Sequence, residues 1–481
     1  MTPPLLPQRD RLTGDNPAAS SAARRWGRWG LILYGLCTLA AGLHLGIVFS
    51  LPEDAVQRWA AEGPYSKAWV TAISVTAVWL LLGSVLVLLE RGVLGGRWLL
   101  SILLFYLVAL LYATFLRERT FFGDAWDYSN AAFDIYHGKP FQRYTYLPFW
   151  ACCLRLFVGL GRTGVVGVCV ASALLSLMAL YWLLVGLLRR FGFSPNLAGL
   201  CAALALLVCV PAQRTLFYGQ VNFMVIDLIL VMILTASRWP ILSAAALAAA
   251  VHVKMSPIVF VLPMLVSRQV KWLVAFAAAL AAIVGLTFLA GGGPEYYEQV
   301  SRSLGSIHTA NLPSDRFRDF SIDSLFLAAG DLARADPAWI HAAMLSVKAL
   351  VVLALLGLVW RAGRRKPFWA DSAGLGHLYN MTPPLLVLMV MTSPLVWPHH
   401  LVFLLPTLVL LAPHLVTPGR RFAFGAAIFF LLLLPVFDVY PLGHGRLIGV
   451  GIICWLIYAA DFARGKSTLD AMNRWADRRS G

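Results

Sequence analysis

Charged residues are scarce in this chain. Only 13% of its 481 residues are Asp, Glu, Lys or Arg, whereas 59% are hydrophobic and the mean hydropathy is +0.74. Soluble domains carry about 25% charged residues, so the composition excludes an ordinary soluble protein. Apolar runs of about 17–25 residues recur along the sequence, and a helix of that length crosses a bilayer.

Several other features are missing. The apolar runs do not alternate as barrel strands would, which predicts an all-α, polytopic helical bundle. There is no Gly-rich nucleotide loop and no evident internal repeat, which weakens a transporter built from inverted repeats. The seven cysteines lie mostly inside apolar runs and show neither a disulfide framework nor metal-ligand spacing. We therefore expect no metal and no cofactor.

Positive charge exceeds negative charge, with a formal net charge of +16. The basic residues form small clusters between apolar runs, which indicates membrane topology and contact with anionic lipid and not nucleic-acid binding. All clusters fall on one side if residues 146–161 form an amphipathic helix at the outer surface. The sequence then predicts about 12–14 spans with both termini on the cytoplasmic side.

The predicted spans are near 31–49, 69–89, 98–116, 164–188, 197–217, 220–236, 240–253, 256–267, 272–290, 338–360, 378–397, 399–416, 422–439 and 446–462. They divide the chain into a disordered basic N-terminus (1–28), two extra spans (29–97), a core (98–462) with long external loops (117–163 and 291–337), and a basic cytoplasmic tail (463–481).

The first external loop is unusually polar for its surroundings. Asp124 and Asp127 lie there among aromatic and basic residues, where partial desolvation can tune the pKa of a carboxylate. Such a carboxylate can accept a proton from an attacking hydroxyl. The alternative is a solvated loop in which an aspartate, Asp127 above all, caps a short helix. Tyr144 and Tyr146 follow, and they could equally form an interfacial aromatic belt.

Polar residues also gather at later outer turns. Arg214, Gln220 and Asn222 offer partners for phosphate and sugar hydroxyls, although helix capping and snorkelling explain them too. Lys254, inside apolar sequence, is expected to face a cavity and bind phosphate unless it snorkels.

His399 and His400 end the series. They can bind phosphate or hydroxyls, or they can simply be polar residues at a helix end. Adjacent histidines point to different faces of a helix, which disfavours a shared metal. The topology was fixed by the basic clusters alone, yet it places all of these polar groups on the outer side.

Five short motifs occur in order along the core. They are D-x-W-D-Y with A-A and H-G-K-P-F (124–141), Y-x-Y-x-P (144–148), G-Q-V-N (219–222), K-x-x-P (254–257) and S-P-x-x-W-x-H-H (393–400). Together they resemble the GT-C class of membrane glycosyltransferases, and more narrowly the family 87 polyprenol-phosphate-mannose-dependent α-mannosyltransferases. The chain departs from that pattern at Leu147, at Pro398, and at Asp319-Phe320-Ser321, where the family commonly has Asn-x-Ser.

The resemblance implies an inverting transfer of a sugar, with mannose expected, from a polyprenyl monophosphate to a hydroxyl on the external face. It implies that Asp124 is the general base. Lys254, with Arg214 or the two histidines, would stabilise the leaving phosphate, and Gln220 and Asn222 would position donor or acceptor. Asp127, Tyr128, Tyr144 and Tyr146 complete the expected substrate-binding residues.

Other readings stay open at this point. The chain could be a transporter or flippase of a polyprenyl-linked or anionic substrate, or a lipid-binding subunit without catalysis. A transporter places its ionisable groups near mid-membrane on broken helices, whereas here they gather at one face. The acceptor could be a glycolipid, a polysaccharide or a protein. The resemblance suggests a bacterial inner membrane, and the sequence identifies no protein partner.

Overall fold

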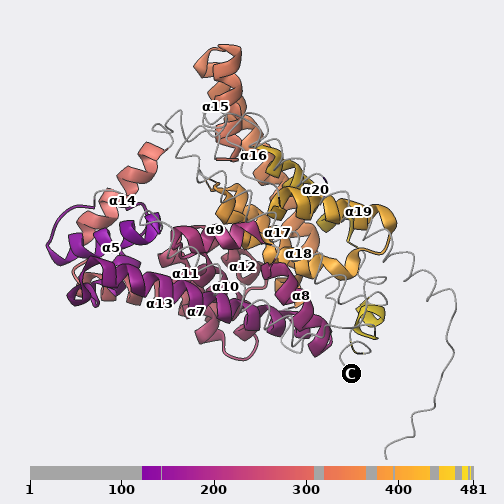
Figure 1. The fold of residues 1–481 in the computed structure, drawn as a ribbon, viewed down its shortest axis with the longest axis horizontal. Coiled ribbons are helices and arrows are strands. Elements are labelled where there is room, and N and C mark those ends of the chain that lie inside the picture. The colour runs from indigo at the N-terminus through magenta and orange to yellow at the C-terminus, as the bar shows by residue number, and fades with distance from the viewer. Residues whose placement is uncertain are drawn as a thin grey trace, which may run out of the picture.

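The computed structural model describes residues 122–141, 144–207, 209–307, 319–364, 376–393, 396–433, 444–460, 469–474 and 477, together with Leu39. Within these ranges every regular element is a helix, as Figure 1 shows, and the predicted all-α membrane fold class is confirmed. The predicted N-terminal segment 1–28 and the spans at 69–89 and 98–116 lie outside the described residues, as does 31–49 apart from Leu39.

The helices follow one another along the chain with these bounds: α5 Gly123–Tyr136, α6 Phe149–Arg155, η1 Val158–Leu160, α7 Gly161–Arg190, α8 Pro195–Leu207, α9 Val210–Tyr218, α10 Asn222–Thr235, α11 Pro240–Val253, η2 Ser256–Phe260, α12 Val261–Val266, α13 Val270–Leu289, α14 Pro294–Ile307, α15 Ile322–Ala333, α16 Pro337–Arg364, α17 Gly376–Met391, η3 Pro398–Leu404, α18 Leu405–Leu411, η4 Ala412–His414, α19 Pro418–Ile428, η5 Phe429–Leu433 and α20 Gly445–Ala459.

Three described segments are long and apolar enough to cross a membrane. They are Val158–Arg190, which contains α7, and helices α13 and α16, with mean hydropathies of 2.3 to 2.4. They coincide with the predicted spans 164–188, 272–290 and 338–360. Shorter apolar helices, such as α10 and α11, account for other predicted spans. The total of 12–14 spans stays a prediction.

The single span predicted at 197–217 is wrong. The structure divides it into α8 and α9, and Cys209 between them has an extended backbone with φ −89° and ψ 93°. Pro211 lies in the first turn of α9. Proline has no backbone N–H to donate and its ring clashes with the preceding turn, so it begins a helix and does not continue one.

The amphipathic helix predicted at 146–161 is shorter than expected. It consists of α6 and the single turn η1, and α6 packs against α5, α11 and α13. Cys152 and Leu154 are buried in that contact, whereas Leu156 and Leu160 are 83% and 63% exposed. The segment therefore has one face toward the protein and one apolar face outward, as a surface helix requires.

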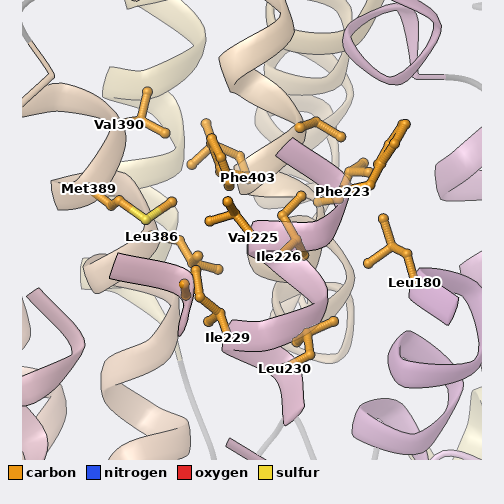
Figure 2. Close-up of a cluster of buried hydrophobic side chains, with 14 of the residues drawn as sticks. Leu180, Phe223, Val225, Ile226, Ile229, Leu230, Leu386, Met389, Val390 and Phe403 are labelled. Atoms are coloured by element: carbon orange, nitrogen blue, oxygen red, sulfur yellow. The ribbon is translucent and has the colours of Figure 1, made fainter. Parts of the chain in front are cut away.

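The core is centred on α10, which packs against α7 and α11. Figure 2 shows its side chains between those of α17 on one side and Leu180 of α7 on the other. Phe223, Val225 and Ile226 are fully buried. The start of α10 is thereby held rigidly in the middle of the molecule, immediately after the polar turn at Gly219–Gln220.

Parts of the two loops predicted to be external, 117–163 and 291–337, are hydrogen-bonded to each other. Helix α14 lies beside α5 (Figure 1), and its Tyr296 hydroxyl donates to the Lys139 carbonyl at 3.1 Å. The backbone N–H of Phe141 donates to Gln299 Oε1 at 2.9 Å. These bonds fix the segment that follows α5 and leads to Tyr144.

A helical segment at 469–474 caps the turn between α7 and α8. The Ser194 N–H donates to Asn473 Oδ1, and Asn473 Nδ2 donates to the Gly192 carbonyl, both at 2.7 Å. Leu469 is only 2% exposed. One asparagine side chain thus satisfies a donor and an acceptor at a helix junction, where backbone groups lack partners within the helices.

Candidate functional site

Asp124 lies in the first turn of α5, which begins at Gly123. The preceding residue, Phe122, has the left-handed φ of 69°, and its N–H donates to the Phe217 carbonyl of α9 at 3.0 Å. The start of α5 is therefore anchored to the end of α9. Asp127 lies inside the helix and not at its N-terminus, so the interpretation of Asp127 as a helix cap is wrong.

Gly219 brings the α9–α10 turn close to α5. Its φ is +66°, and a Cβ atom built on it would lie 2.7 Å from the Ala125 Cβ. Only glycine meets both demands, because it tolerates positive φ and adds no side chain. The next residue, Gln220, is consequently placed against Asp124, and its Nε2 donates a hydrogen bond to Asp124 Oδ2.

Three tyrosines form one wall of the site. The ring centroids of Tyr128, Tyr144 and Tyr146 lie 5.6 to 6.1 Å apart, within the range of edge and tilted aromatic contacts. The hydroxyls of Tyr128 and Tyr146 both donate to Gln220 Oε1, at 3.2 and 3.3 Å. The hydroxyl of Tyr144 donates to the Leu147 carbonyl at 3.1 Å.

Lys254 follows α11, where the backbone becomes extended at φ −153° and ψ 122°. Its Nζ donates to Asn222 Oδ1 at 3.0 Å and lies 5.3 Å from the centre of the Phe403 ring. Asn222 Nδ2 lies 3.4 Å from the His399 carbonyl. Asn222 therefore links the cation to the segment that carries the two histidines.

His399 and His400 lie in η3 and are buried. Their ring centroids are 4.6 Å apart, and the ring of His399 also packs near Tyr218 and Trp397. Arg214 and Lys254 both lie close enough to His399 to act on it electrostatically. The predicted polar turn that contains Arg214 and the one that contains Lys254 are thus both close to His399.

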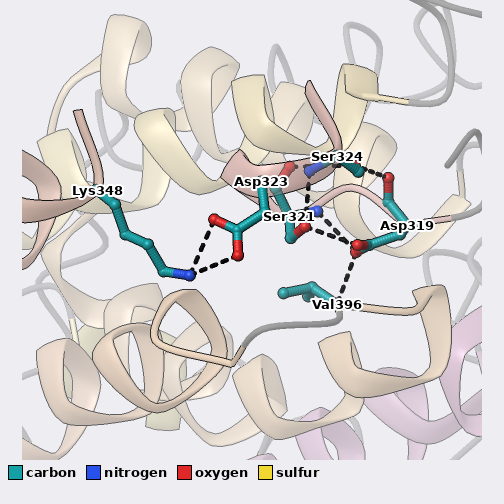
Figure 3. A network of polar contacts seen from close by, with 6 residues as sticks. All are labelled: Asp319, Ser321, Asp323, Ser324, Lys348 and Val396. Carbon is teal, nitrogen blue, oxygen red and sulfur yellow. Dashed lines mark hydrogen bonds and ion pairs between the residues drawn. The ribbon is translucent and has the colours of Figure 1, made fainter. Parts of the chain in front are cut away.

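The segment before η3 is hydrogen-bonded to residues 319–320 of the second loop that was predicted to be external. Asp319 Oδ1 accepts a 2.7 Å hydrogen bond from the Val396 N–H, and the Phe320 N–H donates to the Val396 carbonyl at 3.1 Å. The same carboxylate accepts from the N–H and the hydroxyl of Ser321, at 2.9 and 2.7 Å. Figure 3 shows Asp319 between Ser321 and Val396.

The network continues away from the site. Ser324 Oγ lies 2.9 Å from His444 Nε2, and Lys348 forms an ion pair with Asp323 at 2.7 Å. Sequence reasoning noted only that Asp319-Phe320-Ser321 departs from a family motif. The signal that was available is this run of short polar side chains directly before an apolar helix, which is typical of a helix N-terminus.

These elements enclose a cavity of about 480 Å³. Nine of the eleven predicted site residues line it, whereas Arg214 and Asn222 are not among the lining residues. Sequence reasoning did not include eight further lining residues: Thr145, Leu147, Tyr218, Met255, Ser256, Thr392, Ser393 and Trp397. Ser393 and Trp397 are defining residues of the motif at 393–400, so their position there was a usable signal. Thr145, Leu147, Met255 and Ser256 occupy variable positions of the motifs at 144–148 and 254–257, and Tyr218 directly precedes the motif at 219–222.

Two of the charged residues that line the cavity, Asp124 and Lys254, have pKa values shifted toward neutral pH. Burial and the nearby Asp127 carboxylate together raise the pKa of Asp124 to about 7, against the opposing effect of Lys254. Burial lowers the pKa of Lys254 to about 7, which Asp124 opposes. Burial also raises the pKa of Tyr128 well above its usual value, so its hydroxyl stays a hydrogen-bond donor. A carboxylate with a pKa near 7 is suited to general base catalysis at neutral pH.

Metal ligation has little support in the described ranges, which contain no group of three or more His, Cys, Asp or Glu able to hold an ion. The six described cysteines are free. What the cavity does offer is a carboxylate, a lysine ammonium, and several hydroxyl and imidazole groups. Such a set can accept a proton from a hydroxyl and stabilise an anion in one enclosed space.

The chain matches the model of Glycosyltransferase family 87 over residues 144–382. Over 226 residues it is 28% identical to the polyprenol-phosphate-mannose-dependent alpha-(1-2)-phosphatidylinositol mannoside mannosyltransferase of Mycolicibacterium smegmatis. That match covers 45% of this chain, and it spans about half, 47%, of the relative. No solved structure gives a significant match.

These findings confirm the resemblance to family 87 and support a membrane glycosyltransferase. The family match includes Tyr144, Tyr146, Gln220 and Lys254, but Asp124 precedes it. His399 and His400 follow it. The roles of the individual residues stay predictions.

Proposed function

We propose that this protein transfers mannose from a polyprenyl monophosphate to a hydroxyl of an acceptor at the external face of the membrane, with inversion at the anomeric carbon. The observation that carries the proposal is the single cavity of about 480 Å³ that contains both Asp124 and Lys254. One group can act as a base and the other can stabilise a phosphate.

In this mechanism Asp124 accepts the proton of the acceptor hydroxyl as its oxygen attacks the anomeric carbon. The bond from that carbon to the phosphate oxygen breaks, and the lipid phosphate leaves with the bonding electrons. Attack from the side opposite the leaving group inverts the carbon in one step. Positioning of both reactants in the cavity supplies the entropic part of the rate enhancement.

The leaving group becomes more negative as the bond breaks. Lys254 lies beside Asn222 and on the ring of Phe403, where its ammonium is held in one place. A fixed cation in a site with little water stabilises developing charge without reorganisation. His399, His400 and Ser393 line the same cavity and offer hydrogen bonds to phosphate or sugar oxygens.

The donor and acceptor classes draw on the relative from Mycolicibacterium smegmatis, whose name specifies polyprenol-phosphate-mannose and a phosphatidylinositol mannoside. A lipid monophosphate donor and a glycolipid acceptor also suit a chain with at least three helices able to span a bilayer. We assign the chain to the bacterial inner membrane. The basic clusters of the sequence orient the cavity to the external side.

The test is sugar transfer by purified protein in nanodiscs from radiolabelled polyprenyl-phosphate-mannose to a membrane-lipid extract. Wild type is expected to label a lipid, and the folded variant Asp124→Asn is expected to lose about 10²–10⁴-fold in kcat, the usual contribution of a general base. Movement of the donor across the membrane without any transfer would favour the flippase instead.

A further inference from the structure

Gln220 has an environment that differs from that of a substrate ligand. It is only 4% exposed, and both polar atoms of its amide already contact the protein. Oε1 accepts from the hydroxyls of Tyr128 and Tyr146, and Nε2 donates to Asp124. Hydrogen bonding to a sugar, the role expected from the sequence, is left with the second N–H of the amide, because Oε1 already accepts two bonds and the first N–H donates to Asp124.

The orientation of this amide follows from its partners. An ionised carboxylate only accepts hydrogen bonds, so the group that faces Asp124 has to be the NH₂. Oε1 then faces Tyr128 and Tyr146, whose hydroxyls can donate to it. If the amide were reversed, Oε1 would face the carboxylate oxygen and two acceptors would repel. The two tyrosines therefore select the orientation that supports the ionised form of Asp124.

The backbone around this amide is equally constrained. Gly219 packs directly on Ala125, and the Phe122 N–H is bonded to the Phe217 carbonyl. The turn that carries Gln220 and the helix that carries Asp124 are thereby joined on both sides of the contact. The bond to Gln220 engages Oδ2 of a carboxylate that also lines the cavity.

We propose that Gln220 is the positioning residue for the Asp124 carboxylate, and that Tyr128 and Tyr146 fix its amide. The kinetic part of this proposal rests on the proposed function, whereas the electrostatic part does not. A hydrogen bond donated to a carboxylate favours its charged form and lowers its pKa. Loss of the donor is expected to raise the pKa of Asp124 by about one unit, since a bond to a charged group is worth that much or more.

The first measurement is an infrared pH titration of the protonated carboxyl C=O band of Asp124, which is identified by its loss in Asp124→Asn. Gln220→Leu removes the donor, and the nearly isosteric Gln220→Glu replaces it with a second acid. Gln220→Leu is expected to raise the titration midpoint of Asp124 by about one unit or more. In Gln220→Glu the two neighbouring acids titrate as a pair, and the upper midpoint of the pair is expected to lie above that of wild type. An unchanged midpoint in the folded Gln220→Leu protein overturns the proposal.

Gln299→Leu is the matched control. This glutamine also bonds to the chain through both amide atoms, but its partner is the backbone of Phe141. It does not line the cavity. Its removal is expected to leave the midpoint of Asp124 unchanged, and an equal shift in this variant would mean that the titration reports general loosening and not the loss of the specific donor.

The second measurement is steady-state transfer. A positioning role predicts that Gln220→Glu lowers kcat and moves the acidic limb of kcat/KM to higher pH, with the donor KM nearly unchanged. A raised KM with unchanged kcat and pH profile would make Gln220 a substrate ligand and overturn the proposal. If wild type transfers no sugar, the proposed function fails, and the infrared titration still decides the role of Gln220.

Discussion

The Nζ atom of Lys254 lies 3.0 Å from Oδ1 of Asn222, the first residue of α10. Asn222 is itself fully buried and lies within 3.4 Å of the His399 carbonyl through its Nδ2. The amide thus directs the lysine toward the cavity while holding the histidine segment in place. Asn222 does not line the cavity, so its effect on the site passes through Lys254 and the His399 segment.

Replacement of Lys254 by methionine is expected to keep the fold and to lower kcat by about 10²–10³-fold, the usual loss when one group that stabilises developing charge is removed. Methionine keeps the packing against Phe403 and removes only the charge. Transfer rates in nanodiscs measure the effect. A variant that loses donor binding but keeps kcat would show that the lysine contributes equally to ground-state and transition-state binding.

The pH dependence should be bell-shaped, with its maximum near 7. Asp124 has to be ionised to act as a base, so kcat/KM rises as pH passes its pKa of about 7. Lys254 has to be protonated to stabilise the phosphate, so kcat/KM falls as pH passes its pKa, also about 7. Because the two groups interact, the two limbs report the pair and not each residue alone.

The variant Lys254→Arg distinguishes the acidic limb of the pH profile of kcat/KM from its alkaline limb. Arginine stays protonated throughout this pH range, so the alkaline decline is expected to disappear while the acidic limb remains. A pH profile of kcat/KM for the variant beside wild type is the measurement. Persistence of the alkaline decline would assign it to another group.

Asp319 is expected to contribute strongly to stability. Asp319→Ala leaves the backbone N–H groups of Ser321 and Val396 without their acceptor, which costs about 1–3 kcal/mol for each buried donor. Asp319→Asn keeps an oxygen and should cost less. Thermal unfolding in detergent ranks the two variants, with Ser346→Ala, at an exposed hydroxyl, as the neutral control. An Asp319→Ala protein as stable as wild type would contradict the network's importance.

Gly219→Ala tests the contact between the α9–α10 turn and α5. The added methyl group meets the Ala125 Cβ at 2.7 Å and requires an unfavourable φ of +66°, so we expect a loss of more than about 1 kcal/mol in the free energy of unfolding. Gly186→Ala is the matched control, because that glycine is inside α7 and its Cβ would meet only Leu234 at 3.6 Å. Denaturation midpoints compare the two, and equal midpoints would contradict the tight approach.

Much of this site could be predicted because its residues stand out against apolar sequence. Asp124, Lys254 and His399 are costly to bury, and the positive-inside rule placed them on one side without knowledge of their contacts. What could not be predicted is pairing over long sequence distances. Nothing local in the sequence says that Asp319 accepts from Val396, or that Gln220 is already occupied by Tyr128.

The lack of local signals also explains the errors in the predicted helix boundaries. Hydropathy reports that 197–217 is apolar, but it does not report that Pro211 begins a new helix there. It likewise extends the surface segment at 146–161 beyond α6, because an apolar stretch looks alike whether it continues as one helix or ends in a single turn.

The bond between Asn473 and the turn after α7 also has a bearing on the order of folding. Ser194 leaves the ribosome 279 residues before Asn473 does, an interval on the order of tens of seconds at ordinary rates of synthesis. When α7 and α8 have been synthesised, the turn between them therefore still lacks its hydrogen bonds to Asn473. Those bonds form only after every intervening segment has been made. Closure of this junction is therefore a late step in synthesis, not a local event.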